Sequence, residues 1–110
     1  MEIVRKSKEF NKRELYKLTK GETVSLQKTV GFVFDVDAFV LFTDTNTKGD
    51  EVEILAILAQ DGNVYTTISE TFKQRFFEIV EHFGMEELPP IVVTEGQSNA
   101  GRRYIACTIE

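Results

Sequence analysis

The sequence predicts a mainly β (α+β) fold, in which a five-stranded sheet curls toward a barrel and one helix lies between the third and fourth strands. Three observations support this prediction. Alternating or continuous apolar runs, separated by turn signals, fill residues 22–68. One helical pattern follows at residues 70–83, and two further strand patterns occupy residues 91–109. This order is the connectivity of the OB-fold barrel, which other small curled α+β sheets with one helix share.

The first predicted elements are a short helix and a long strand. Residues 11–20 bring Leu15 and Leu18 close together and are followed by Gly21, which predicts a short helix or turn. Residues 22–34 alternate between apolar and polar side chains, as a half-buried strand does. Gly31 within this strand predicts a bulge or sharp bend. The long strand would leave an unpaired edge that could pair with another copy of the chain, so self-association is possible.

Two more strands follow a turn. Asp35 and Asp37 predict the turn, and residues 38–43 form the next strand pattern. Residues 51–59 are apolar on both alternation faces from Ile54 onward. A strand of this kind is covered on each side, so we expect it at the centre of the sheet.

A tight turn, a helix and a last hairpin complete the pattern. Asp61–Gly62 between apolar runs predicts a hairpin that returns through Val64 and Tyr65. Ser69 is the predicted N-cap of the helix and Gly84 its end. Strands at residues 91–95 and 102–109 flank the last loop. The apolar face of the helix consists of Phe72, Phe76, Ile79, Val80 and Phe83.

Charge is distributed unevenly along the chain of 110 residues, whose net charge is -5. Residues 1–20 hold seven Lys or Arg against three acids, whereas residues 21–110 hold six bases against fifteen acids. We therefore divide the chain into a basic N-terminal arm or short helix, residues 1–20, and a single OB-like domain, residues 21–110. A basic arm of this kind is suited to contact something anionic.

Several classes of protein are not indicated. No run of apolar residues is long enough to span a membrane, and the N-terminus does not read as a signal peptide. The single cysteine, Cys107, cannot form an internal disulfide. We expect a soluble, cytoplasmic protein.

The residues that enzymes and metal sites need are also missing from the pattern. The only histidine, His82, has no cysteine or serine motif near it, and one histidine with one cysteine does not make a zinc site. The aspartates near residues 35–50 lack calcium-loop spacing. The glycines match neither phosphate-binding motif. We therefore predict no enzyme, no metal and no cofactor.

Aromatic and basic residues suggest instead a surface for single-stranded nucleic acid. The chain has nine Phe and three Tyr, and proteins bind single strands by stacking bases on aromatic rings while cations follow the phosphates. The ordinary alternative is that the Phe residues form the core and the cations solubilise strand ends. The predicted base platforms are Phe32, Phe34, Phe42, Tyr65 and Tyr104. The predicted phosphate contacts are Lys28, Lys48, Arg102 and Arg103.

Two stretches carry a resemblance to a known family. ILAILAQDGNVYTTISETF at residues 54–72 and VVTEGQSNAGRRYIACTI at residues 92–109 resemble the single-stranded DNA-binding proteins of small protein-primed phages related to phi twenty-nine. The resemblance extends from Gly21 to the end and implies a non-catalytic protein that coats displaced strands during phage DNA replication, in the host-cell cytoplasm and alongside replication proteins. It also implies a stacking role for Tyr65.

A second hypothesis starts from the acidic body, which is unfavourable for DNA because sequence-independent affinity comes from Lys and Arg at phosphates. On this hypothesis the chain is a small acidic phage protein that mimics DNA and inhibits a host protein. Where the acids lie relative to the Phe-bearing strands distinguishes the two hypotheses. On the DNA-mimic hypothesis, the surface that binds the host protein would be formed by Asp35, Asp37, Asp44, Asp50, Glu51 and Glu53.

Overall fold

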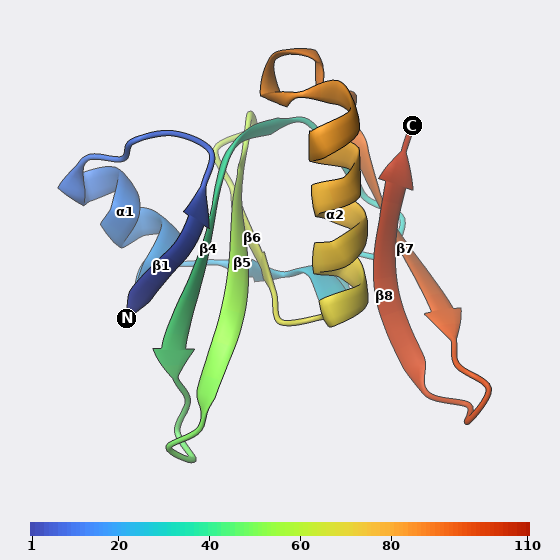
Figure 1. The fold of residues 1–110 in the computed structure, drawn as a ribbon. Coiled ribbons are helices and arrows are strands. Elements are labelled where there is room, and N and C mark those ends of the chain that lie inside the picture. The colour runs from blue at the N-terminus through green and yellow to red at the C-terminus, as the bar shows by residue number, and fades with distance from the viewer.

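The computed structural model, which describes all 110 residues, contains two β-sheets and a helix that packs against them with one face (Figure 1). The larger sheet has five strands in the order β1-β4-β5-β6-β2, and all neighbours are antiparallel except β6 and β2. Its strands are β1 (Glu2–Lys6), β2 (Val24–Ser25), β4 (Val36–Thr45), β5 (Glu51–Ala59) and β6 (Val64–Thr67).

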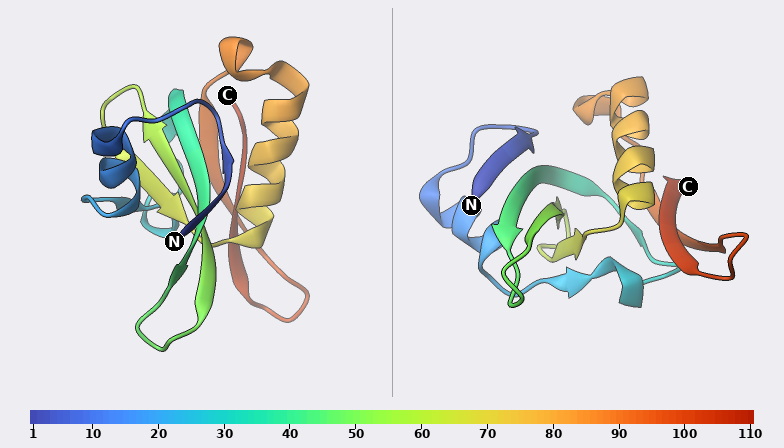
Figure 2. Two further views of the ribbon diagram at one scale, coloured as in Figure 1. Left: turned by 60° about the vertical axis from the view of Figure 1, so that its left-hand side comes forward. Right: turned by 60° about the horizontal axis from the view of Figure 1, so that its bottom comes forward.

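The smaller sheet and the helices complete the fold. The smaller sheet is antiparallel, with the order β3-β7-β8. Helix α2 packs in one core cluster with residues of both sheets, and α1 covers the other face of the larger sheet (Figures 1 and 2). The bounds of these elements are β3 (Val33–Phe34), β7 (Ile91–Gln97), β8 (Arg103–Ile109), α1 (Lys12–Thr19), α2 (Glu70–Phe83) and two 3₁₀ turns, η1 (Leu26–Lys28) and η2 (Met85–Glu87).

The core has two parts, separated by the larger sheet. The main cluster fills the space between the two sheets and α2, and Leu55 and Ile57 of β5 contribute to it. The smaller cluster lies beneath α1, and Ala56 of β5 belongs to it together with Leu18. Alternate residues of β5 are therefore buried on opposite faces, which confirms its predicted position as a central strand.

The predicted long strand at residues 22–34 is wrong, because the chain changes sheets there. The segment divides into β2, η1 and β3. Gly31, with a φ of 90°, and Phe32 both oppose Val93: Gly31 N–H donates to the Val93 carbonyl, and Val93 N–H donates to the Phe32 carbonyl. This is the bulge that Gly31 predicts. The strands on either side of it have two residues each, so the long free edge expected for self-association is not formed.

Other differences concern the number and closure of the strands. The structure has eight strands in two sheets and no closed barrel, and α2 follows the sixth strand rather than the third. Residues 2–6, expected in a basic arm, form β1, which pairs with β4 through a bulged register. The predicted turn at Asp35 and Asp37 is instead a junction at which β3 of one sheet leads directly into β4 of the other.

Two hairpins define one side of the molecule. The β4–β5 and β7–β8 hairpins project in the same direction (Figure 1). Seen from that side, β2 and η1 cross the space between them (Figure 2, right). None of the helices is both long enough and apolar enough to cross a bilayer.

Candidate nucleic-acid interface

Two adjoining cavities lie along β2 and η1, and together we name them the β2–η1 groove. One cavity has a volume of about 210 Å³ and the other about 250 Å³, and Gln27 lines both. The first is completed by Arg103, Tyr104 and Ile105, and the second by Ser25, Ile54, Thr66, Thr67 and Ile68.

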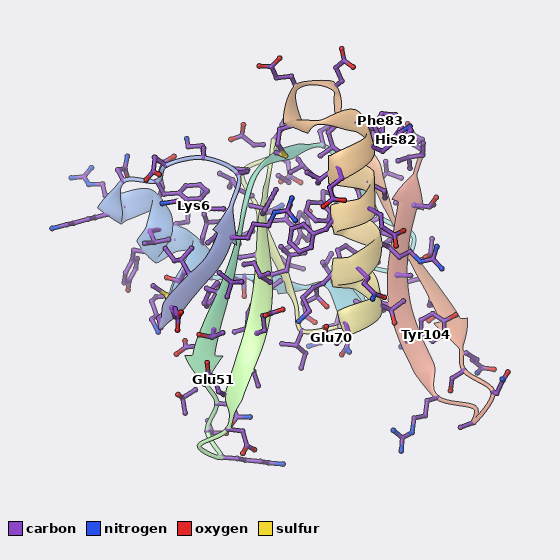
Figure 3. The ribbon with its side chains drawn as sticks, viewed as in Figure 1. Lys6, Glu51, Glu70, His82, Phe83 and Tyr104 are labelled. Carbon is purple, nitrogen blue, oxygen red and sulfur yellow. The ribbon has the colours of Figure 1, made fainter.

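Tyr104 is an exposed aromatic residue of β8 that borders this groove. It is paired across the hairpin with Gly96. A Cβ atom on Gly96 would lie 2.6 Å from both Cζ and Oη of Tyr104, so the ring rests directly on the glycine backbone. Tyr104 is 40% exposed, and Figure 3 shows its position on β8. One ring face is therefore supported by the sheet while the other is open to a stacking partner.

Three of the predicted cations lie on η1 or at the start of β8, and one of them bonds the two elements together. The Arg103 guanidinium donates a hydrogen bond of 3.2 Å from Nη2 to the Gln27 carbonyl and forms an ion pair with Glu95. Lys28 follows Gln27 directly, and Arg102 lies at the end of the β7–β8 turn. Neither Lys28 nor Arg102 forms an ion pair. Both charges are exposed and available to a polyanion.

Phe32 is exposed and lies beside the bulge at Gly31. Its carbonyl and amide are held by Val93 and by Thr29, and its side chain remains 52% exposed at the edge of the smaller sheet. The structure thus gathers some of the predicted site residues around this sheet and η1. They are Lys28, Phe32, Arg102, Arg103 and Tyr104.

Three predicted base platforms lie in the core and offer no ring face at the surface. Phe34 and Tyr65 stack on each other with ring centroids 4.8 Å apart, and Tyr65 is only 4% exposed. The Tyr65 hydroxyl donates to Asp61 Oδ2 at 3.1 Å, and burial raises the pKa of Tyr65. Phe42 packs beneath α1. The reason is register: each of these side chains lies on a strand face that is covered by another element.

Lys48 lies apart from the other predicted residues, in the β4–β5 turn. Its backbone N–H donates to Asn46 Oδ1 at 2.9 Å, and the next residue, Gly49, has a φ of 86°. The Lys48 side chain forms no ion pair. It provides a cation on the hairpin opposite Arg102.

Ile68 and Gln27 line the groove but were not among the predicted site residues. Ile68 is 58% exposed, an unusual position for an isoleucine. The sequence contains one signal for it. Ile68 comes directly before the N-cap Ser69. An apolar residue at this position commonly packs against an apolar fourth residue of the helix. Here the fourth residue of the helix is Lys73, so Ile68 has no apolar partner at that position. Nothing in the local pattern marks Gln27.

The acids of the second hypothesis do not form one face. Asp35 and Asp37 lie at the start of β4, at the opposite end from the β4–β5 turn, which carries Asp50 and, at the start of β5, Glu51 (Figure 3). Asp44 pairs with Lys20 at 3.1 Å, and the hydrogen bond from Lys20 lowers the pKa of Asp44. Glu53 pairs with Lys73. This arrangement does not favour a DNA mimic.

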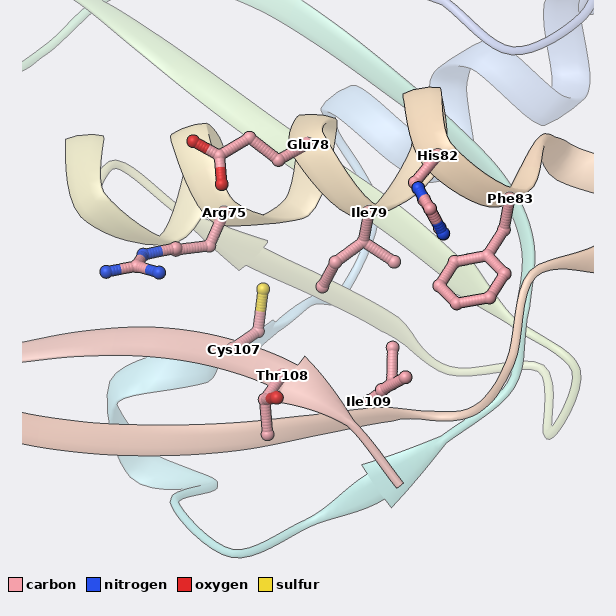
Figure 4. Close-up of a pocket in the computed structure, with 8 residues that line it drawn as sticks. All are labelled: Arg75, Glu78, Ile79, His82, Phe83, Cys107, Thr108 and Ile109. Carbon is pink, nitrogen blue, oxygen red and sulfur yellow. The ribbon is translucent and has the colours of Figure 1, made fainter.

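A separate cavity of about 380 Å³ lies between α2 and β8 (Figure 4). His82 and Cys107 both line it, but none of the predicted site residues does. Cys107 is buried, and burial raises the pKa of its thiol to about 12. No group of His, Cys, Asp and Glu in the structure is arranged to hold a metal ion.

Comparison with known proteins gives one match. A family model described as "Phage Single-stranded DNA-binding protein", of the phi twenty-nine type, matches residues 7–110. The match includes α1 and every strand except β1. No curated protein and no solved structure matches the chain.

Proposed function

The chain belongs to the family of phage single-stranded DNA-binding proteins, and from this premise we propose that it coats displaced single strands during phage DNA replication by binding alone, in the host-cell cytoplasm. The bases stack on Tyr104 and Phe32, and the phosphates are bound by cations of η1 and of the two hairpins. These cations are Lys28, Lys48, Arg102 and Arg103.

The observation that carries this proposal is the exposed ring of Tyr104, held against the Gly96 backbone on the same strand that carries Arg103. A preformed ring face loses little side-chain entropy when a base stacks on it, and such a stack contributes about 1–3 kcal/mol. In OB-like folds, oligonucleotides bind on the sheet surface between projecting loops. The β2–η1 groove lies on the side of the molecule toward which the β4–β5 and β7–β8 hairpins project (Figures 1 and 2).

The charge of the molecule limits the affinity of a single copy. Residues 21–110 are strongly acidic, and Arg103 is partly neutralised by Glu95. Affinity that comes from phosphate contacts decreases as the salt concentration rises. The slope of log affinity against log salt concentration reports the number of these contacts. Contacts between copies along the strand would add to this affinity, and self-association and contacts with replication proteins belong to the same proposal.

The test is a titration of labelled poly-dT followed by fluorescence anisotropy at low and moderate salt, with duplex DNA as competitor. We expect salt-sensitive binding that duplex does not displace. Tyr104→Ala and Arg103→Gln should each weaken it, whereas Tyr104→Phe, which keeps the ring, should bind like the wild type. Absence of binding at protein concentrations in the tens of micromolar, or equal competition by duplex, would overturn the proposal.

A further inference from the structure

The outer face of helix α1 extends the groove. We propose that Lys12, Arg13, Tyr16 and Lys17 form a second contact for the same single strand, so that the strand runs from α1 along β2 and η1 to β8. This inference rests on the proposed function and adds a surface to it.

The helical period separates the residues of α1 into two faces. Leu18 is buried against the larger sheet and Leu15 packs beside it. Asn11 caps the helix: its side chain accepts from the Glu14 N–H at 2.8 Å, and Glu14 accepts in turn from the Asn11 N–H. Tyr16 points away from the sheet and is 66% exposed. At 100° per residue, one continuous arc opposite the leucines contains Lys12, Arg13, Tyr16, Lys17 and Lys20.

The cations of this arc are mostly free. Lys12, Arg13 and Lys17 form no ion pair, whereas Lys20 pairs with Asp44. The only acid of α1, Glu14, is engaged by Lys8. Three unpaired cations within two turns, with an exposed tyrosine among them, are the combination that a single strand requires.

The remaining cations of the chain are more dispersed. Residues 21–110 hold six Lys or Arg, of which Lys73 is buried between Glu53 and Glu70 and Arg103 is paired. The α1 face is therefore the densest group of free positive charge on an otherwise acidic molecule. A polyanion is the partner that complements it.

A third cavity joins this face to the groove. It has a volume of about 320 Å³ and is lined by Lys17, by Glu22 to Val24, and by the turn at Gly62 and Asn63. Ser25, the residue after Val24, already lines the β2–η1 groove. Because β2 pairs in parallel with β6, its start lies near this turn and its end near Thr66. The cavities therefore follow one another along β2, and Glu22 is the one acid among their lining residues.

Strands of two lengths and two double variants test the inference. We use oligo-dT of about 4 and about 16 nucleotides, the limits of the site size of an OB fold. Lys12→Gln/Lys17→Gln removes two free charges of the arc. Lys6→Gln/Lys8→Gln is the matched control, because it removes two charges that are paired with Glu9 and Glu14. Gln and Lys have similar helix propensities, so α1 should persist, which circular dichroism checks.

We expect Lys12→Gln/Lys17→Gln to decrease the salt slope for the long strand by about 1.4, since each lost phosphate contact accounts for about 0.7. Binding of the short strand should not change. Tyr16→Ala should weaken the long strand about tenfold without altering the slope, because it removes a stacking ring and no charge.

The outcomes separate this inference from the proposed function. If the wild type binds neither strand, the proposed function fails and the inference fails with it. If the wild type binds both and Lys12→Gln/Lys17→Gln leaves the affinity and slope for the long strand unchanged, only the inference is overturned. An equal effect of Lys6→Gln/Lys8→Gln would also overturn it, because net charge alone would then explain the result.

Discussion

Tyr104 shows how one glycine can position an aromatic ring that we propose binds DNA. The ring occupies the space that a side chain at position 96 would take. We expect Gly96→Ala to push the ring off the sheet and to weaken binding of poly-dT by about as much as Tyr104→Ala, roughly 1–3 kcal/mol. Anisotropy titrations of the two variants and of the double variant provide the measurement. Additive losses in the double variant would contradict a shared cause.

Tyr65 belongs to the core, so its replacement should affect stability first. Tyr65→Ala removes a ring that stacks on Phe34, and we expect a loss of about 3–5 kcal/mol in the free energy of unfolding. Tyr65→Phe loses only the hydrogen bond to Asp61, with an expected cost of about 0.5–1.5 kcal/mol. Urea unfolding measures both. A Tyr65→Ala variant with wild-type stability and no DNA binding would mean that the ring is exposed when DNA binds.

Cys107 gives a prediction about pH. Burial holds the pKa of its thiol at about 12, whereas an unfolded thiol ionises near about 8.5. The folded state therefore favours the protonated form. Its contribution to stability is complete below the unfolded pKa and is lost as pH rises from about 8.5 toward 12. Iodoacetamide, which attacks thiolates, should modify the native protein slowly at pH about 8.5 and the urea-unfolded protein rapidly. Rapid modification of the native protein, followed by mass spectrometry, would show that the thiol is accessible.

Among the elements, those with local signals could be predicted from the sequence. The N-cap Ser69 and the glycine after Phe83 define α2, and the Asp61–Gly62 turn defines the β5–β6 hairpin. The break after Ser25 could not be predicted, because apolar alternation continues through residues whose strands belong to different sheets. The missed strand β1 has an exposed, charge-rich pattern and is held by pairing with β4, which is a long-range contact.

Only part of the candidate site could be predicted, because the rest also depends on contacts between residues far apart in the sequence. Residue type identified rings and cations, but it does not tell an exposed Phe32 from a buried Phe34 two positions later. Phe32 lies beside the bulge at Gly31, before β3 begins, whereas Phe34 lies within β3 and is covered by Tyr65. Tertiary structure alone brings Arg103 to the Gln27 carbonyl.

The bulge can be tested as an element. Gly31→Ala places a Cβ at a φ of 90°, with an expected cost of about 1–3 kcal/mol, and it should also weaken DNA binding because Phe32 is displaced. Gly49→Ala is the matched control, since Gly49 has a similar φ in the β4–β5 turn. We expect comparable destabilisation in urea for both variants and a loss of affinity beyond that of the control only for Gly31→Ala. Equal affinities would exclude a role for the bulge in binding.

For the whole molecule, binding should be linked to folding. The groove is assembled from β2, β5, β6, η1 and β8, so the unfolded chain has no groove. A ligand specific for the folded state at about 100 times its Kd stabilises that state by about 2.7 kcal/mol. We expect poly-dT to raise the Tm in thermal unfolding and high salt to abolish the increase. Duplex DNA of equal length is the control, and an equal increase with duplex would contradict single-strand selectivity.

On the proposed function, the protein is needed in many copies, and the free edge that β1 gives the larger sheet then matters. Exposed edge strands join like strands from neighbouring molecules and lead to aggregation. Strand β1 is short, its register is interrupted between Ile3 and Arg5, and charged residues lie on either side of its two apolar ones. These features make β1 a poor template for pairing with a strand of another molecule. A coating protein must accumulate in proportion to the length of DNA that it covers, and an edge that resists aggregation lets the chain reach such concentrations while it remains dispersed.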